Sequence, residues 1–165
     1  MKDISVGQAQ KLTAPAPFAL LSACGGDGKT NLMAVSWWTY LSNHPPKLCV
    51  CLSNKGCSGR LIRETGEFAV NVVDESMKES ALKCGRCSGS TVDKIAEFGI
   101  GTVPAAEIRP LLVENSRVVF ECRLSDMLDV GDHTIYVGEI VAVHGDETKK
   151  QLFAFDGYAR LDTVQ

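Results

Sequence analysis

The sequence has no run of lysine or arginine residues, and its overall charge is slightly acidic. It carries 17 lysines and arginines against 20 aspartates and glutamates, which gives a formal net charge of -3 at pH 7. Domains that bind nucleic acid or anionic membranes usually concentrate basic residues on one face. We therefore expect neither nucleic acid nor a membrane as a partner.

Long hydrophobic runs are also missing. No segment approaches the roughly 18 consecutive apolar residues of a membrane-spanning helix, and residues 1–26 lack the apolar core of a secretory signal. The seven cysteines are an odd number without regular spacing, which fits reduced thiols better than a disulfide framework. We expect a cytoplasmic protein. Because no linker or repeat divides its 165 residues, we also expect one domain over 1–165.

Two common ligand motifs are absent. No Gly-x-Gly-x-x-Gly turn stands between a strand and a helix, which argues against a Rossmann cofactor site. The Cys84-Gly-Arg-Cys87 segment has no second Cys-x-x-Cys, and the three histidines are scattered, so we expect no metal site. A redox-active thiol pair and an ordinary loop with incidental thiols both remain open for this segment.

Apolar segments of strand length dominate the sequence, bounded by Gly, Pro, Asn and Asp. In Val118–Leu124 the alternation predicts Phe120 and Cys122 inside and Glu121 outside, as in a half-buried antiparallel strand. In 47–52, Leu48, Val50 and Leu52 share one face. The expected strands are 18–24, 31–38, 47–53, 67–73, 117–128, 134–143 and 152–161.

Helical patterns are fewer and short. They cover 57–66, with Ser58 as the expected N-cap and Gly66 as the stop, 74–85, opened by Asp74, and 91–99. Many strands with about three short helices predict a mainly β fold, a closed antiparallel barrel with helical insertions.

Residues 53–62, "SNKGCSGRLI", lead from a predicted strand into a predicted helix. Backbone N–H groups and the helix dipole favour a phosphate there, Gly56 and Gly59 allow close approach, and Lys55 and Arg60 add charge. Taken alone, such a Gly/Ser segment is more often only a turn.

The stretch "NLMAVSWW" interleaves small and bulky residues. Small side chains at Ala34 and Ser36 would let a flat ring lie against the backbone, although an ordinary core strand has the same pattern. Neighbouring strand residues point to opposite faces, so one tryptophan enters the core and the other faces outward; we expect Trp38 outward. His133 follows the Gly131-Asp132 turn and is either a turn residue or a ligand contact.

The order of these segments resembles the flavin reductase-like, FMN-binding split-barrel family. The resemblance rests on Asn-x-Met-x-x-Ser-Trp at 31–37, the Pro-Pro pair, the 53–62 turn, "TGEFAVNV" at 65–72 and "GDHTIYVGEI" at 131–140. The Trp37-Trp38 pair and residues 84–89 resemble the flavoredoxin-type branch. The family implies a six-stranded antiparallel split barrel of Greek-key type that forms a homodimer and binds FMN near the interface.

The resemblance also implies roles for individual residues. The isoalloxazine ring would lie along Asn31, Met33, Ala34, Val35 and Ser36, with Trp37 and Trp38 near its edge. The ribityl phosphate would lie at Ser53, Asn54, Lys55, Cys57 and Ser58, and the site would be closed by Cys87, Ser88 and Gly89. His133 would be the catalytic residue at the face where nicotinamide or a partner approaches.

The sequence departs from the family pattern at the phosphate segment and after the Ser-Gly pair. Many relatives have a basic residue, threonine and histidine where Gly56, Ser58 and Gly59 stand, and an arginine in place of Ser90. The expected function is an NAD(P)H-dependent flavin reductase, with NADH or NADPH as donor. The alternatives are an electron carrier with bound FMN that serves a redox partner protein, and a non-catalytic flavin-binding sensor.

Overall fold

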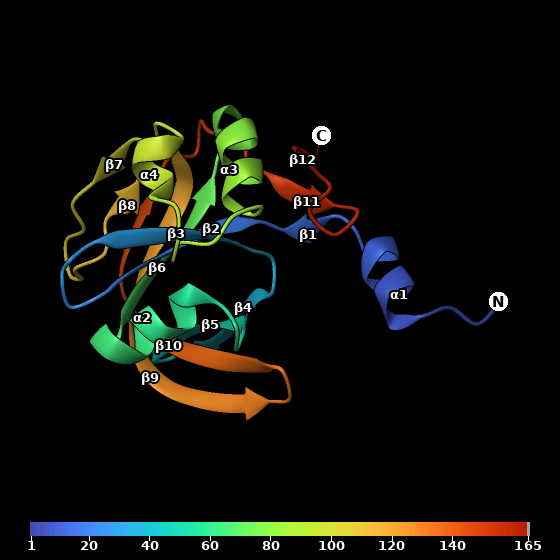
Figure 1. The fold of residues 1–165 in the computed structure, drawn as a ribbon, viewed down its shortest axis with the longest axis horizontal. Helices are drawn as coiled ribbons and strands as arrows, with labels where there is room; N and C mark the ends of the chain where they lie inside the picture. Colours follow the sequence, from blue (N-terminus) through green and yellow to red (C-terminus); the bar gives the residue numbers. More distant parts are fainter. Residues whose placement is uncertain (165) are drawn as a thin grey trace.

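The computed structural model describes residues 1–164 and is mainly β, as expected, with 46% strand and 18% helix. Its main sheet has seven strands, all paired antiparallel, in the order β3-β2-β6-β9-β10-β5-β4 (Figure 1). Their bounds are β2 Ala19–Cys24, β3 Thr30–Val35, β4 Trp38–Asn43, β5 Pro46–Ser53, β6 Glu67–Val73, β9 Ser116–Val130 and β10 His133–Gly145. The strand number therefore differs slightly from the expected six, while the fold class agrees.

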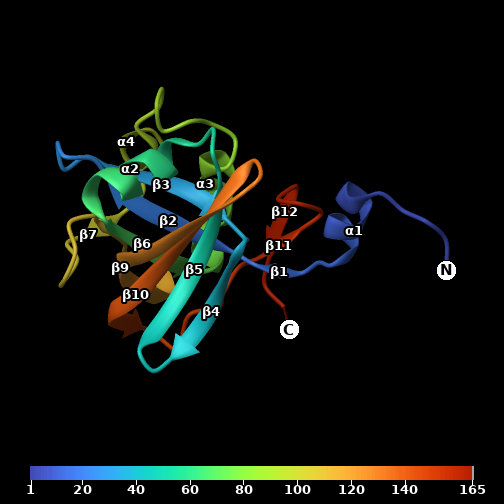
Figure 2. The ribbon, with the colours of Figure 1, turned by 90° about the horizontal axis from the view of Figure 1, so that it is seen from below.

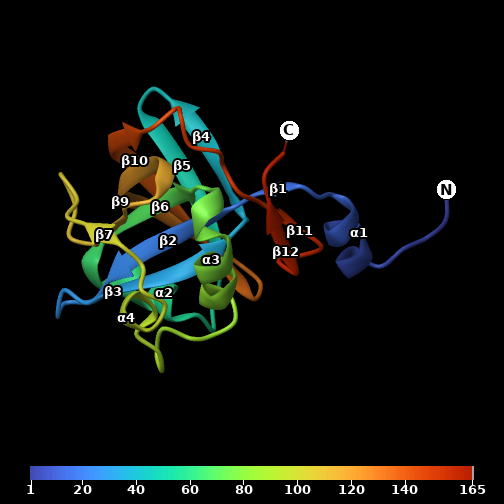
Figure 3. The same ribbon diagram turned by 90° about the horizontal axis from the view of Figure 1, so that it is seen from above.

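Short strands and helices surround this sheet. One small sheet contains β1 (Ala16–Pro17), β11 (Phe153–Phe155) and β12 (Arg160–Asp162). The other contains β7 (Thr102–Val103) and β8 (Leu112–Val113). The helices are α1 Val6–Leu12, α2 Cys57–Thr65, α3 Lys78–Cys84 and α4 Lys94–Glu97, with a 3-10 turn at Glu75–Met77. Figure 3 shows α3 beside β3. Within residues 1–164 no helix combines the length and the apolar character needed to span a bilayer.

The helix ends follow local chemistry, with one correction. Gly66 ends α2 in the left-handed conformation (φ 71°), and Asp74 caps the next turn by accepting the Ser76 N–H. The expected N-cap at Ser58 is wrong, because Gly56 caps α2 and Ser58 lies inside its first turn. Helix α1, absent from the expected elements, begins with a capping box between Ser5 and Gln8.

The main sheet is buried on both sides near its centre. Along β2, Ala19, Leu21 and Ala23 belong to one core cluster and Leu20 to a second, each 0% exposed. This two-sided burial explains why the segment reads as a continuous apolar run. Along β5, Leu48, Val50 and Leu52 point into the first cluster, as the alternation predicts.

Glu121 on β9 contradicts the expected outward position, because its side chain is fully buried. The segment around Ile108 covers this face of β9 and packs on Val119. The Glu121 carboxylate accepts hydrogen bonds from the N–H groups of Ala106 (2.9 Å) and Glu107 (2.7 Å) and contacts His144 Nε2 at 2.6 Å. Burial alone would raise the pKa of Glu121, but these donors outweigh it and hold the pKa below its ordinary value.

This lowered pKa predicts a loss of stability in acid. The stabilising contribution of Glu121 is complete above the unfolded-state pKa of about 4.3 and is lost as the pH falls through the lower folded-state pKa. Glu121→Gln should lower the free energy of unfolding at pH 7 by about 1–3 kcal/mol and flatten this acid dependence. Urea unfolding across the acid range tests this, with the exposed Glu139→Gln as control. An equally steep acid dependence in the Glu121 variant would contradict the assignment.

Candidate functional site

Two adjoining cavities lie on either side of the end of β3. One has a volume of about 290 Å³ and the other about 430 Å³, and both are lined by Met33, Ala34 and Ser53. Because they share these walls, the two cavities adjoin, and we refer to the pair as the groove. We name them the tryptophan cavity, which Trp37 lines, and the lysine cavity, which Lys55 and Lys94 line.

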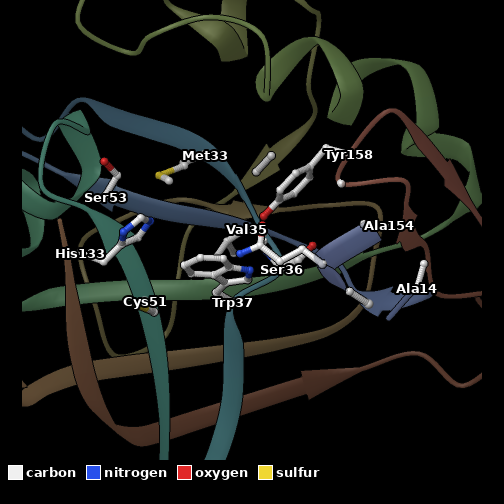
Figure 4. Close-up of a pocket in the computed structure, with 14 residues that line it drawn as sticks. Ala14, Met33, Val35, Ser36, Trp37, Cys51, Ser53, His133, Ala154 and Tyr158 are labelled. Carbon is white, nitrogen blue, oxygen red and sulfur yellow. Dashed lines mark hydrogen bonds between the residues drawn. The ribbon is translucent and has the colours of Figure 1, made fainter. Parts of the chain in front are cut away.

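Two neighbouring rings, those of Trp37 and His133, line the tryptophan cavity (Figure 4). Trp37 is 46% exposed, and its ring centroid lies 4.9 Å from that of His133 at an interplanar angle of 35°. His133 Nδ1 lies 2.8 Å from Asp132 Oδ1, and this hydrogen bond with the nearby imidazole lowers the pKa of Asp132. With Nδ1 engaged, Nε2 is the His133 nitrogen left for a ligand.

The remaining walls of this cavity are small or apolar, with one polar corner. Ala14, Ala16, Val35 and Ala154 line it. At the corner, the Ser36 N–H donates to Tyr158 Oη at 2.7 Å, and Ser36 Oγ is buried without a hydrogen-bond partner within residues 1–164 (Figure 4). Such a cavity suits a flat, largely apolar ring with polar atoms on its edge.

The lysine cavity lies between the segment that leads from β5 into α2 and the segment that follows α3. Lys55, Cys57 and Ser58 contribute one side, and Arg86 and Ser88 the other. The cavity wall therefore combines three basic side chains with hydroxyl groups and the amino end of the nine-residue helix α2. This composition favours an anion.

Lys94 is the buried charge of this cavity. It is 5% exposed, and its Nζ donates one hydrogen bond, to the Cys84 carbonyl at 2.8 Å. No ion pair joins it to a carboxylate within residues 1–164. A buried ammonium group without a counter-charge is costly, so an anion in the cavity would relieve the cost.

Close packing of Asn31 against the 84–89 segment shapes the cavity entrance. Asn31 Nδ2 donates to Ser58 Oγ at 3.0 Å, while its Oδ1 is buried without a partner in residues 1–164. A Cβ atom on Gly89 would lie 1.9 Å from Asn31 Oδ1. Only glycine fits at position 89 unless Asn31 moves. Glycine there lets the backbone of the 84–89 segment lie close to Asn31.

The structure brings most of the expected site residues together. The tryptophan cavity is lined by Met33, Ala34, Val35, Ser36, Trp37, Ser53 and His133. The lysine cavity is lined by Asn31, Met33, Ala34, Ser53, Lys55, Cys57, Ser58, Cys87, Ser88 and Gly89. Of the expected residues, Trp38 and Asn54 line neither cavity.

Trp38 is a correction to the expected orientation of the tryptophan pair. It pairs with the buried Val50 of β5, and its ring packs near Phe120, 6.2 Å between centroids. Trp37 is therefore the outward ring. Asn54 acts at a distance from the groove, since it donates to the Gly131 carbonyl (3.2 Å) and accepts from Thr134 Oγ1 (2.7 Å). These bonds fasten the 53–56 turn to the hairpin that carries His133.

Lys94 and Tyr158 were missed as site residues by the sequence patterns. Lys94 sits inside a short helical pattern, where lysine is usually solvated, and Tyr158 lies far along the chain from β3. Lys94 ends the segment "KCGRCSGSTVDK" at 83–94, which belongs to the family resemblance, but that resemblance assigned it no role; Tyr158 reaches the cavity through tertiary contacts, and we find no local signal for it. Burial raises the pKa of Cys84 to about 11, which disfavours the reactive thiolate at this member of the Cys84–Cys87 pair. Within residues 1–164 no group of three or more metal-ligating side chains is assembled.

The antiparallel sheet and the groove with apolar and cationic ends define a mainly β protein with a site suited to an elongated, partly anionic ligand. Comparison with known families makes this specific, because the flavin reductase like domain matches residues 12–162. The chain belongs to this family, as its sequence motifs indicated.

Individual relatives agree with this membership. The chain is 32% identical over 135 residues to the actinorhodin polyketide dimerase of Streptomyces coelicolor, covering 81% of this chain and 72% of that protein. It is 28% identical to the flavin reductase (NADH) of Kitasatospora aureofaciens, covering 78% and 65%. The solved flavoredoxin of Desulfovibrio vulgaris superposes with a TM-score of 0.86 at 25% identity, covering 100% of this chain and 94% of that one.

Proposed function

We propose that this protein is an NAD(P)H-dependent flavin reductase that binds FMN in the groove, with the ring system in the tryptophan cavity and the phosphate in the lysine cavity. The observation that carries the proposal is the buried Lys94 ammonium at one end of a groove whose other end is flat and apolar. Relatives whose names include flavin reductase and flavoredoxin support it.

The residues present fit FMN. Asn31 Oδ1 and Ser36 Oγ are buried polar atoms without protein partners in residues 1–164; Asn31 lines the lysine cavity and Ser36 the tryptophan cavity. A ring system with polar edges would give such atoms partners, which matters because an unsatisfied buried polar group costs about 1–3 kcal/mol. Lys55, Ser58 and Lys94 would hold the phosphate.

The protein's part in the reaction is to position the reactants and to supply a side chain that can donate or accept a proton. FMN, when bound, supplies the hydride-accepting chemistry. Trp37, which is 46% exposed, and His133 line the cavity, and a nicotinamide ring from NADH or NADPH would approach over these two rings. Asp132 fixes the imidazole through Nδ1, so that Nε2 can exchange a proton near the ring.

Flavin titration followed by rapid mixing with NADH or NADPH tests this function. Fast reduction of bound FMN is the expected result. Slow reduction by both nucleotides, combined with fast electron transfer to a redox protein from bound FMN that has been reduced beforehand by a chemical reductant, would identify an electron carrier instead. Binding without either reaction would identify a sensor, and no binding of FMN would overturn the proposal.

We also propose that two copies pair through the outer strands near the tryptophan cavity. Figure 2 shows β4 at the sheet edge beside β5, β10 and β9. Large apolar side chains are exposed there, among them Tyr40 (61%), Leu41 (50%) and Leu128 (59%). Exposed apolar edges of this kind mark interaction surfaces.

Light scattering should therefore give about twice the 17.8 kDa mass of one chain. Leu41→Lys should shift the protein to a monomer, because a charge on the edge strand opposes strand-to-strand association. Leu12→Lys, on the exposed face of α1, should not. A monomeric wild-type chain at micromolar concentration would contradict the pairing.

A further inference from the structure

The polar corner of the tryptophan cavity holds an unused hydrogen-bond donor. Tyr158 Oη accepts the Ser36 N–H, so the hydrogen of the phenol itself must be donated elsewhere. Within residues 1–164 no hydrogen bond gives this hydrogen an acceptor; Ser36 Oγ, in the same corner, lies near the phenol and is itself buried without a hydrogen bond of normal geometry. Two hydroxyl groups thus stand together in a cavity whose other walls are mostly apolar.

The backbone holds Tyr158 in this corner in an uncommon conformation. Asp156, Gly157 and Tyr158 have consecutive positive φ angles of 52°, 60° and 75°. The left-handed region is unfavourable for residues other than glycine, and such residues concentrate where they contact ligands. The Tyr158 ring also packs edge-on against Phe18, with centroids 6.2 Å apart. The hydroxyl position is therefore fixed from two sides.

The phenol keeps its hydrogen at neutral pH. Tyr158 as a whole is 36% exposed, but desolvation at its hydroxyl end raises its pKa, and the nearby Ser36 hydroxyl and N–H only partly offset this. A hydroxyl that accepts one hydrogen bond is polarised and becomes a better donor of its own hydrogen. The corner therefore offers a neutral, oriented O–H group.

We propose that Tyr158 is a specificity-determining residue whose hydroxyl donates to a ring carbonyl oxygen of the flavin, with Ser36 Oγ as a second polar contact. This inference rests on the proposed function, since it names a contact within the same groove. A ring oxygen gains negative charge when the ring is reduced, so the bond should favour the reduced form. Tyr158 would then raise both the affinity for the ring and its reduction potential.

Tyr158→Phe tests the inference, because it removes the hydroxyl and retains the ring that packs on Phe18. The dissociation constants of FMN and riboflavin should both rise by the same factor, about three- to tenfold. The two-electron midpoint potential of bound flavin should fall, by about 30 mV for each tenfold difference between the losses in reduced and oxidised affinity. Tyr136→Phe is the matched control, since the Tyr136 hydroxyl also accepts a hydrogen bond, from Arg63 Nε at 3.1 Å, but Tyr136 lines neither cavity.

The possible outcomes separate this contact from the proposed function. Unchanged or tighter flavin binding in Tyr158→Phe, with an unchanged potential, would overturn the inference and leave the function standing. A wild-type chain that binds neither flavin would overturn the function and the inference together. Should Tyr158→Phe fold poorly in a thermal melt, Ser36→Ala replaces it, and loss of affinity for both flavins remains the supporting result.

Discussion

Lys94→Met should weaken FMN binding by about 10- to 100-fold and leave riboflavin binding unchanged, as hydrogen bonds to charged groups contribute roughly 1.5–3 kcal/mol. The reason is that riboflavin has the same ring system but no phosphate for the Lys94 ammonium to contact. Fluorescence titration of the variant with both flavins measures the two affinities. Equal losses for FMN and riboflavin would mean that Lys94 supports the fold and not the anion.

The same variant should make the ligand-free protein more stable. The Lys94 ammonium is buried with one carbonyl contact and no carboxylate partner in residues 1–164. Replacing it with a similarly long apolar side chain removes a desolvation cost and should raise the free energy of unfolding by about 1–3 kcal/mol.

Urea unfolding without flavin measures this change. Lys78→Met is the control, since Lys78 pairs with Asp162 on the surface of α3 at 3.4 Å and lines neither cavity. The control should alter neither stability nor flavin affinity appreciably. A Lys94 variant less stable than the wild type would contradict the inference that the Lys94 ammonium is uncompensated in the ligand-free protein and is stabilised by a bound anion.

His133→Ala should lower the rate of flavin reduction by NADH or NADPH by about 100-fold, at the lower end of what a positioned acid–base group contributes. FMN affinity should fall much less than the rate, because His133 lines only the tryptophan cavity and the proposed phosphate contacts in the lysine cavity remain. Stopped-flow reduction of the FMN-loaded variant separates rate from binding.

The neighbouring residues sharpen this test. Asp132→Asn should lower the rate less than His133→Ala does, because it disturbs only the bond that orients the imidazole. His44→Ala, in the exposed turn between β4 and β5, should leave the rate unchanged. A His133 variant that loses FMN as strongly as it loses rate would place this residue in flavin binding instead.

The strand pattern predicts the fold class because alternation reports directly on which face is buried. Leu48, Val50 and Leu52 illustrate this, as all three enter one core cluster. Glu121 shows the limit, since the pattern around it cannot reveal that a distant segment covers its face and supplies two N–H donors. The predicted N-cap at Ser58 is wrong because the helix begins earlier, at Cys57, directly after Gly56 in an extended conformation.

The candidate site was predictable where its residues lie in continuous motifs. β3, the 53–58 turn and the 87–89 segment carry family motifs, and all three line the groove. The period of a strand establishes that Trp37 and Trp38 point apart, but only the pairing of Trp38 with Val50 decides which one enters the core. Lys94 and Tyr158 reach the groove from outside these three segments.

Calorimetric titration of the wild-type protein, first with FMN and then in a separate run with riboflavin, tests the central claim most directly. We predict one FMN per chain, riboflavin bound at the same site at least about tenfold more weakly, and competition between the two. Equal affinity for the two flavins would contradict the claim that the groove binds a ring system at one end and a phosphate at the other. So would failure of both to bind.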